Sequence, residues 1–142
     1  MASIVPRFVK KEIVDGWVAE NLYLMLLSSA YTPNATTHQY VSQVSANEVV
    51  DSGGIYPVGG VPLAGKLQGY DPISVNNAFL DANNVSIGPG ATLNYRYGVI
   101  YRNTGNPATS PIRCVIDFVT NQIVTNGTTV INWNALGIIY IS

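Results

Sequence analysis

The sequence predicts an all-β fold, a two-sheet β-sandwich with jelly-roll or Greek-key-like connections and a short helical arm at the N-terminus. Short runs of β-branched and aromatic residues, cut by Asn, Gly and Pro, predict about eight strands. Charged residues are also few: only 11% of the residues are Asp, Glu, Lys or Arg, against about 25% in an ordinary soluble domain. Many short strands with frequent turns favour two packed sheets.

The length of 142 residues allows one core to form without disulfides or metal ions. A hydrophobic content of 47% argues against intrinsic disorder. We expect an arm at residues 1–19 and a single β-sandwich domain at residues 20–142. The longest apolar run, Leu22 to Leu27, is too short to cross a bilayer, and no signal peptide is visible. We therefore expect no membrane partner and synthesis in the cytoplasm.

The N-terminal arm carries a helical pattern. Pro6 suits the first turn of a helix, and Gly16 is expected to end it. Apolar residues recur at helical spacing on one face, namely Val5, Phe8, Val9, Ile13 and Trp17. Such a face docks either on the protein's own core or on a partner, and we include these residues in a predicted interface.

The first half of the domain begins with a strand at residues 21–28 that we expect to be buried on both faces. A short helix capped by Thr36 or Thr37 is expected to follow. Residues 51–60 contain four glycines and are interpreted as a flexible loop. The segments 61–70 and 73–81 are expected to pair, with Pro62 at an edge or a strand start.

The second half is expected to begin with a loop at residues 83–90 and then to contain the clearest strand, Leu93 to Arg102. Asn126-Gly127 predicts a two-residue hairpin turn, and residues 137–142 predict a final strand. We expect one core to bury three residues from separate runs, namely Leu24, Val115 and Trp133.

The sequence offers little catalytic or metal-binding chemistry. A zinc site needs three or four ligands, whereas the chain has one His (His38) and one Cys (Cys114), which we interpret as a surface residue and a small buried hydrophobe. Asp71, Asp81 and Asp117 do not have the spacing of a calcium loop. We predict no catalytic residue, no metal and no cofactor. No basic stripe is present, so no nucleic acid partner is expected.

Nine tyrosines outnumber three phenylalanines. Tyr95, Tyr97 and Tyr101 share one strand face, where they either line the core or meet a protein or sugar. Tyr31 and Tyr56, in expected loops, are included in the predicted interface. The net charge of −1 favours self-association, so the surface is either polar and uncharged or covered by neighbouring subunits.

Several motifs occur in a fixed order along residues 22–142. They are LLSSAYTPNATTHQY (26–40), SANEV (45–49), GGVPLAGK (59–66), LDANNV (80–85), YRYGVIYRNTG (95–105) and INWNALGI (131–138). This order resembles a widespread family of small tailed-bacteriophage virion proteins. No catalytic residues come with the resemblance.

The resemblance implies a decoration (cement) protein that binds the major capsid protein on the icosahedral shell and forms a homo-oligomer, a trimer. It also implies synthesis in the cytoplasm of a bacterial host and a final location on the capsid surface of the virion. The alternative is a tail, head–tail or receptor-binding component that binds protein or host glycan. An enzyme is the third class, which the scarcity of catalytic groups disfavours.

Overall fold

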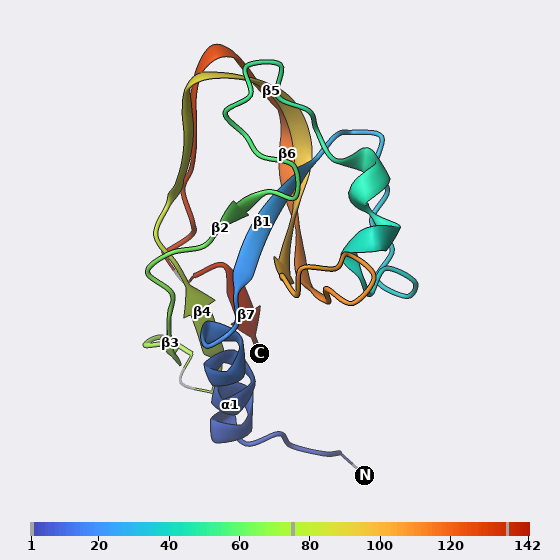
Figure 1. The fold of residues 1–142 in the computed structure, drawn as a ribbon. Coiled ribbons are helices and arrows are strands. Elements are labelled where there is room, and N and C mark those ends of the chain that lie inside the picture. Colours follow the sequence, from blue (N-terminus) through green and yellow to red (C-terminus); the bar gives the residue numbers. More distant parts are fainter. Residues whose placement is uncertain (1, 75, 136) are drawn as a thin grey trace. The chain divides into compact units, whose positions relative to one another are not determined.

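The structure is a computed structural model that describes residues 2–74, 76–135 and 137–142. Within these residues the chain is mostly β-structure, with two antiparallel sheets and one α-helix (Figure 1). The predicted β class and N-terminal helix are therefore confirmed. Val75, in the predicted strand at 73–81, lies outside the described residues, as do Met1 and Leu136.

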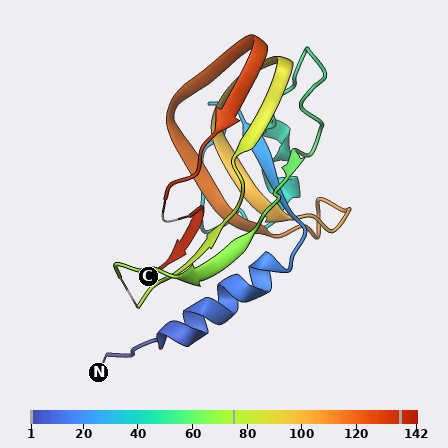
Figure 2. The ribbon, with the colours of Figure 1, turned by 90° about the vertical axis from the view of Figure 1, so that its left-hand side faces the viewer.

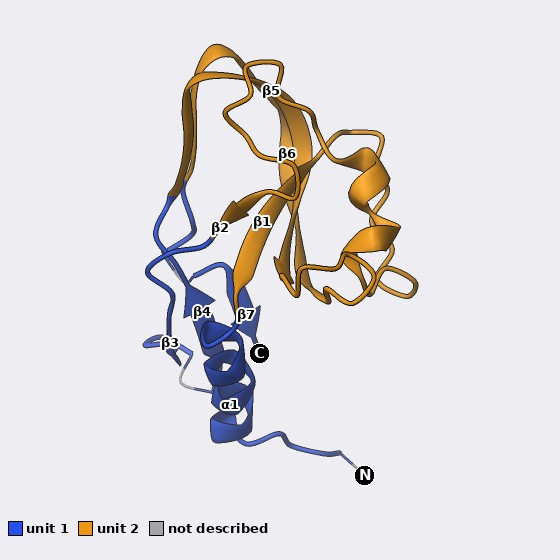
Figure 3. Ribbon diagram, viewed as in Figure 1, with its two compact units in different colours: residues 1–20, 63–84, 132–142 blue, residues 21–62, 85–131 orange. Residues whose placement is uncertain are grey.

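Two compact units make up the chain (Figure 3). Unit 1 contains residues 1–20, 63–84 and 132–142, and unit 2 contains residues 21–62 and 85–131. The predicted division into an arm at 1–19 and a domain at 20–142 does not coincide with these units. The reason is that α1 packs against β3 and β4 from the middle of the chain, and β4 in turn pairs with β7 at its end.

Unit 1 combines a helix with a small sheet. Helix α1 (Arg7–Val18) packs against β3 (Leu67–Tyr70) and β4 (Ala78–Asp81). The sheet has the order β3-β4-β7, where β7 (Ile139–Ile141) is the predicted C-terminal strand. All pairs are antiparallel, with Gly69 opposite Phe79 and Phe79 opposite Tyr140. The predicted pairing of 61–70 with 73–81 is thus confirmed for β3 and β4.

Helix α1 does not end at Gly16, as the sequence predicted, but continues to Val18. Gly16 is not among the residues with a positive φ, so it does not act as a left-handed cap. A glycine inside a helix costs about 1 kcal/mol relative to alanine, which packing against a sheet can offset. Val14 is the one residue of α1 that is fully buried among those described.

Unit 2 contains a sheet with the order β2-β1-β5-β6. Its strands are β1 (Leu22–Leu27), β2 (Val61–Pro62), β5 (Val85–Arg102) and β6 (Ile112–Ile131). Five of the six residues of β1 are buried, which confirms the prediction of a strand covered on both faces. Pro62 lies at the sheet's edge, as predicted, where a missing N–H does not interrupt the hydrogen bonds between central strands.

Strands β5 and β6 form a much longer hairpin than the sequence predicted (Figure 2). Residues 85–90 are part of β5 and do not form a loop. Asn126-Gly127 is not a hairpin turn but an irregularity inside β6, with Asn126 at a φ of 46° and Gly127 opposite Ala91. The Asn126 N–H donates to Thr92 Oγ1 at 3.0 Å, so pairing with β5 continues past the local turn signal.

The predicted common core is wrong for two of its three members. Leu24 is fully buried, but Val115 is 40% exposed and Trp133 is half-buried in the other unit. Trp133 stays near the surface of unit 1, where its indole N–H donates to the Asn83 carbonyl at 2.9 Å. A core of unit 2 is formed instead by Met25, Leu27, Tyr31, Val41, Val44, Val99 and Tyr101.

The segment after β1 contains two 3₁₀ turns, η1 (Val41–Gln43) and η2 (Ser45–Asn47), in place of the predicted helix. Neither Thr36 nor Thr37 caps a helix. Their N–H groups donate to Asn34 Oδ1 at 3.0 and 3.1 Å, so Asn34 closes a local turn that competes with helix formation.

Burial at the centre of β1 generates a stability prediction. Leu24→Ala removes a fully buried side chain and is expected to lower the free energy of unfolding by about 2–5 kcal/mol. Leu67→Ala is the matched control, since Leu67 is 48% exposed and should cost about 1 kcal/mol or less. Chemical denaturation measures both, and equal losses would contradict the assigned burial.

Candidate functional site

The loop at residues 51–60 is ordered around the carboxylate of Asp51, which accepts four backbone hydrogen bonds. Oδ1 accepts from the Gly53 N–H at 2.8 Å and the Thr92 N–H at 2.7 Å. Oδ2 accepts from the Ile55 and Tyr56 N–H groups at 2.7 and 2.8 Å. One side chain therefore closes the loop on itself and joins it to β5.

The same loop needs glycine at its end. Gly59 and Gly60 have φ angles of 93° and 94°, in the left-handed region that side chains rarely adopt. A Cβ on Gly60 would lie 2.0 Å from the carbonyl oxygen of Leu24. These glycines allow the loop to approach β1 closely, so the predicted flexibility is replaced by a fixed conformation.

The fixed loop positions Glu48 through two hydrogen bonds to one oxygen. Oε1 accepts from the Tyr56 hydroxyl at 2.9 Å and from the Gly59 N–H at 2.7 Å. The Tyr56 hydroxyl in turn accepts from the Leu26 N–H at 2.9 Å. Among the described residues no hydrogen bond reaches Oε2 of Glu48.

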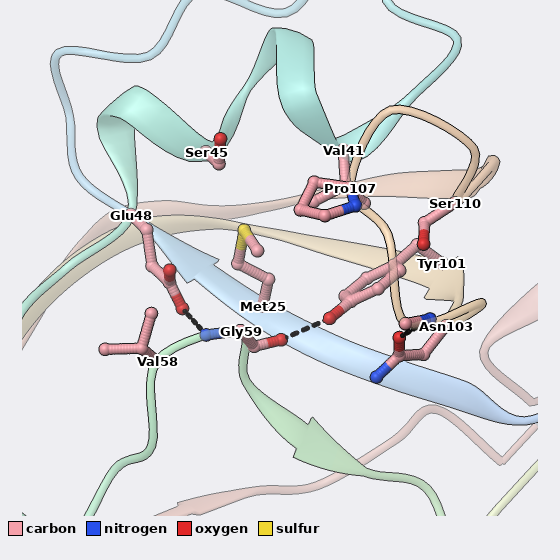
Figure 4. A pocket seen from close by; sticks show the side chains of 11 residues that line it. Met25, Val41, Ser45, Glu48, Val58, Gly59, Tyr101, Asn103, Pro107 and Ser110 are labelled. Carbon is pink, nitrogen blue, oxygen red and sulfur yellow. Dashed lines mark hydrogen bonds between the residues drawn. The ribbon is translucent and has the colours of Figure 1, made fainter.

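Glu48 lines a pocket of about 470 Å³ in unit 2 (Figure 4). Four segments that are distant in the sequence surround it: β1, residues 41–48 with the 3₁₀ turns, the loop 51–60, and the end of β5 with the β5–β6 loop at 103–111. Its described lining residues are Met25, Val41, Ser45, Glu48, Val58, Gly59, Tyr101, Asn103, Gly105, Pro107 and Ser110.

Hydrogen bonds fix the walls of the pocket. The Tyr101 hydroxyl donates to the Gly59 carbonyl at 2.5 Å. The Val41 N–H donates to the Ser110 carbonyl at 3.0 Å, and the Ser42 N–H donates to the Pro107 carbonyl at 3.1 Å. The 3₁₀ turn and the β5–β6 loop are thus held together by backbone hydrogen bonds.

Burial and hydrogen bonds shift the pKa values of this site in opposite directions. It raises the pKa of Glu48 above its ordinary value of 4.5, and the hydrogen bonds from Tyr56 and Gly59 oppose part of that shift. Burial also raises the pKa of Tyr56, and it raises the pKa of Tyr101 to about 12. For Asp51 the hydrogen bonds dominate, first from Thr92 and then from Tyr56, and the pKa falls to about 2.

The predicted interface on the arm is largely exposed. Phe8 is 57% exposed, Val5 and Ile13 are also exposed, and Val9 and Trp17 are half-buried. Ile4, which the helical pattern did not include, is also exposed, and it precedes α1 in the chain. We name these four exposed side chains, Ile4 and Val5 before the helix and Phe8 and Ile13 on it, the apolar face of α1.

The loop tyrosines of the predicted interface are not surface groups. Tyr31 and Tyr56 are buried inside unit 2, so neither ring is available to a partner. Tyr31 packs edge-on against Tyr97, and its hydroxyl lies 3.1 Å from His38 Nδ1. Tyr95 and Tyr101 are buried as well, which confirms that tyrosine rings of β5 line the core.

Each of the remaining candidate residues has its own local environment. Burial raises the pKa of the Cys114 thiol to about 12, so it stays protonated at neutral pH. Asp71 accepts from the Tyr140 hydroxyl, Asp81 from the Ala82 N–H, and Asp117 pairs with Arg96. Among the described residues no three His, Cys, Asp or Glu side chains come together as a metal site.

Sequence reasoning missed Asp51 and Glu48, the two carboxylates that organise the site. Asp51-Ser-Gly-Gly has the local pattern of a turn in which an Asp side chain accepts hydrogen bonds from following N–H groups. That pattern was the available signal for Asp51. Glu48 had none, because its partners Tyr56 and Gly59 reach it through the folded loop.

The chain matches none of the protein-family models, curated proteins or solved structures with which it was compared. Among the described residues, α-helices long and apolar enough to cross a bilayer are absent.

Substitution of Asp51 should change how stability depends on pH. Because the folded pKa of Asp51 lies below its ordinary value of 3.8, its stabilisation is complete above that value and is lost as the pH falls towards 2. Asp51→Asn turns an amide NH₂ towards N–H donors, so its Tm should lie well below wild type at pH 6 and approach it near pH 2. Thermal scans from pH 2 to 6 measure this, with Asp81→Asn as control. A constant Tm difference would contradict the prediction.

Substitution of Glu48 should have the opposite pH dependence. Because burial raises its folded pKa, the contribution of Glu48 is most favourable below its ordinary value of 4.5 and is lost as the pH rises through the folded pKa. Tyr56 and Tyr101, the titratable groups that face it, stay neutral over this range. Glu48→Gln keeps the Oε1 acceptor without the charge, so its Tm relative to wild type should increase from pH 4 to pH 7. A relative Tm that falls over this range would show that the charge stabilises the loop.

Proposed function

We propose that this protein is a structural component of a tailed-bacteriophage virion, a decoration protein that binds the major capsid protein on the outside of the icosahedral shell. The observation that carries the proposal is the apolar face of α1. The ordered motifs of residues 22–142, which resemble small phage virion proteins, supply the biological context.

The apolar face of α1 suits a docking role because it leaves large side chains exposed while the helix is anchored elsewhere. Val14 is buried and α1 packs against β3 and β4, which holds the helix in unit 1. Phe8 on the helix and Ile4 and Val5 just before it stay exposed. An amphipathic helix laid in a groove is a common mode of protein recognition. We assign the major capsid protein as the occupant of this face.

Strand β6 supports assembly of several copies. It is at one end of the sheet order β2-β1-β5-β6 and exposes Val115, Val119, Ile123 and Val130. An edge strand with exposed apolar side chains favours pairing between chains, and a net charge of −1 gives little repulsion. A homotrimer on the capsid surface would multiply modest contacts by avidity.

Two further inferences, about the strand connections and about catalysis, belong to the same proposal. We infer that the sheets form a sandwich with jelly-roll or Greek-key-like connections and that the protein has no catalytic role. Decoration proteins act by repeated contacts, and each standard interface buries about 800 Å² per partner. The burial of Tyr95 and Tyr101 gives no support to the alternative of a glycan-binding tail component.

The proposal is tested by adding purified protein to particles that lack it and counting the copies bound. We expect wild type to occupy the shell with icosahedral symmetry and Phe8→Ser, combined with Val5→Ser, to reduce occupancy about tenfold or more. Circular dichroism should stay unchanged, because both side chains are exposed.

The matched control is Val50→Ser, which removes an apolar side chain that is 84% exposed on unit 2 and should leave occupancy unchanged. Full occupancy of the α1 variant would show that another surface binds the shell. A few copies located at the tail would favour the tail or head–tail alternative.

A further inference from the structure

The pocket of unit 2 contains one charged side chain, Glu48, surrounded by largely apolar walls. Met25, Val41, Val58 and Pro107 supply apolar surface, and the lining residues described include no Lys, Arg or His. Figure 4 shows the Glu48 carboxylate beside Val58 and Gly59, with Met25 between it and Pro107. An anionic ligand would find no counter-charge in this pocket.

A sugar is also a poor fit. Sugar sites usually offer an exposed aromatic ring and several free hydrogen-bonding groups. Tyr101 is only 4% exposed, and its hydroxyl is already bonded to Gly59. Ser110 Oγ donates to the Asn106 carbonyl at 2.8 Å, and Asn103 Oδ1 accepts from the Gly105 N–H at 2.8 Å.

We propose that this pocket binds the side chain of a lysine presented by a partner protein, with the ammonium group at Glu48 Oε2 and the methylene stem along Met25, Val58 and Pro107. A half-buried carboxylate without a cation is costly, and an incoming ammonium would offset that cost. Lys11 pairs with Asp15 and Arg96 with Asp117, and no ion pair joins Glu48 to another of the described residues.

The geometry of Glu48 favours lysine over arginine. Guanidinium groups bind carboxylates best through two parallel hydrogen bonds, one to each oxygen. Oε1 of Glu48 already accepts from Tyr56 and Gly59, which leaves Oε2 as a single acceptor. A compact ammonium needs one such oxygen, and a pocket of about 470 Å³ has room for the stem of a lysine.

The test uses the full chain and three capped amino acids as probes in NMR titrations, read at the amide signals of Gly59 and Gly105. Nα-acetyl-lysine N-methylamide should shift both signals saturably. Nα-acetyl-norleucine N-methylamide has a similar stem without the ammonium group and should bind about tenfold more weakly or worse, as expected for loss of a charged hydrogen bond. The arginine analogue should bind more weakly than the lysine probe.

Glu48→Gln should reduce lysine binding about tenfold. Glu12→Gln, a substitution at an exposed position of α1, should leave it unchanged. The proposal is overturned by equal binding of the lysine and norleucine probes, by unchanged binding of the lysine probe to the Glu48→Gln variant, or by the absence of saturable shifts. Tighter binding of the arginine probe would overturn the choice of lysine. None of these outcomes depends on attachment to a virion, so the proposal goes beyond the function above and fails independently of it.

Discussion

The four hydrogen bonds to the Asp51 carboxylate are the constraint on which the functional region of unit 2 depends. They fold residues 51–56 around one side chain and attach that loop to β5 through Thr92. Tyr56 is thereby placed to bond both Leu26 and Glu48. Since Gly59 then bonds Glu48 and Tyr101, one wall of the pocket follows from the same interaction.

Glu48 and Asp51 show how one loop gives two carboxylates opposite behaviour. Asp51 accepts four N–H groups, so its charge is stabilised and its pKa falls to about 2. Glu48 accepts two hydrogen bonds on one oxygen, which do not offset its burial, so its pKa rises. The first carboxylate is satisfied within the fold, whereas the second retains an oxygen for an external donor.

Helix α1 and strand β6 share a different property, because each is fixed along one side and exposes apolar side chains on another. Val14 anchors α1 while Phe8 stays exposed, and β6 pairs with β5 while Val119 and Ile123 stay exposed. Exposed apolar surface of this kind is typical of proteins that meet other chains. It is consistent with the low charge of the whole sequence.

The sequence by itself determined the β class, the N-terminal helix, the buried strand β1 and the edge position of Pro62, because periodicity and proline chemistry act over a few residues. Tertiary structure alone decided the extent of β6, where pairing with β5 overrode the turn signal of Asn126-Gly127. It also moved Val115 and Trp133 out of a common core.

The pocket was likewise beyond sequence reasoning, since Met25, Glu48, Tyr101 and Pro107 meet only after four distant segments pack together. Local patterns encode backbone preference, whereas burial and the partners of a side chain depend on contacts between remote segments.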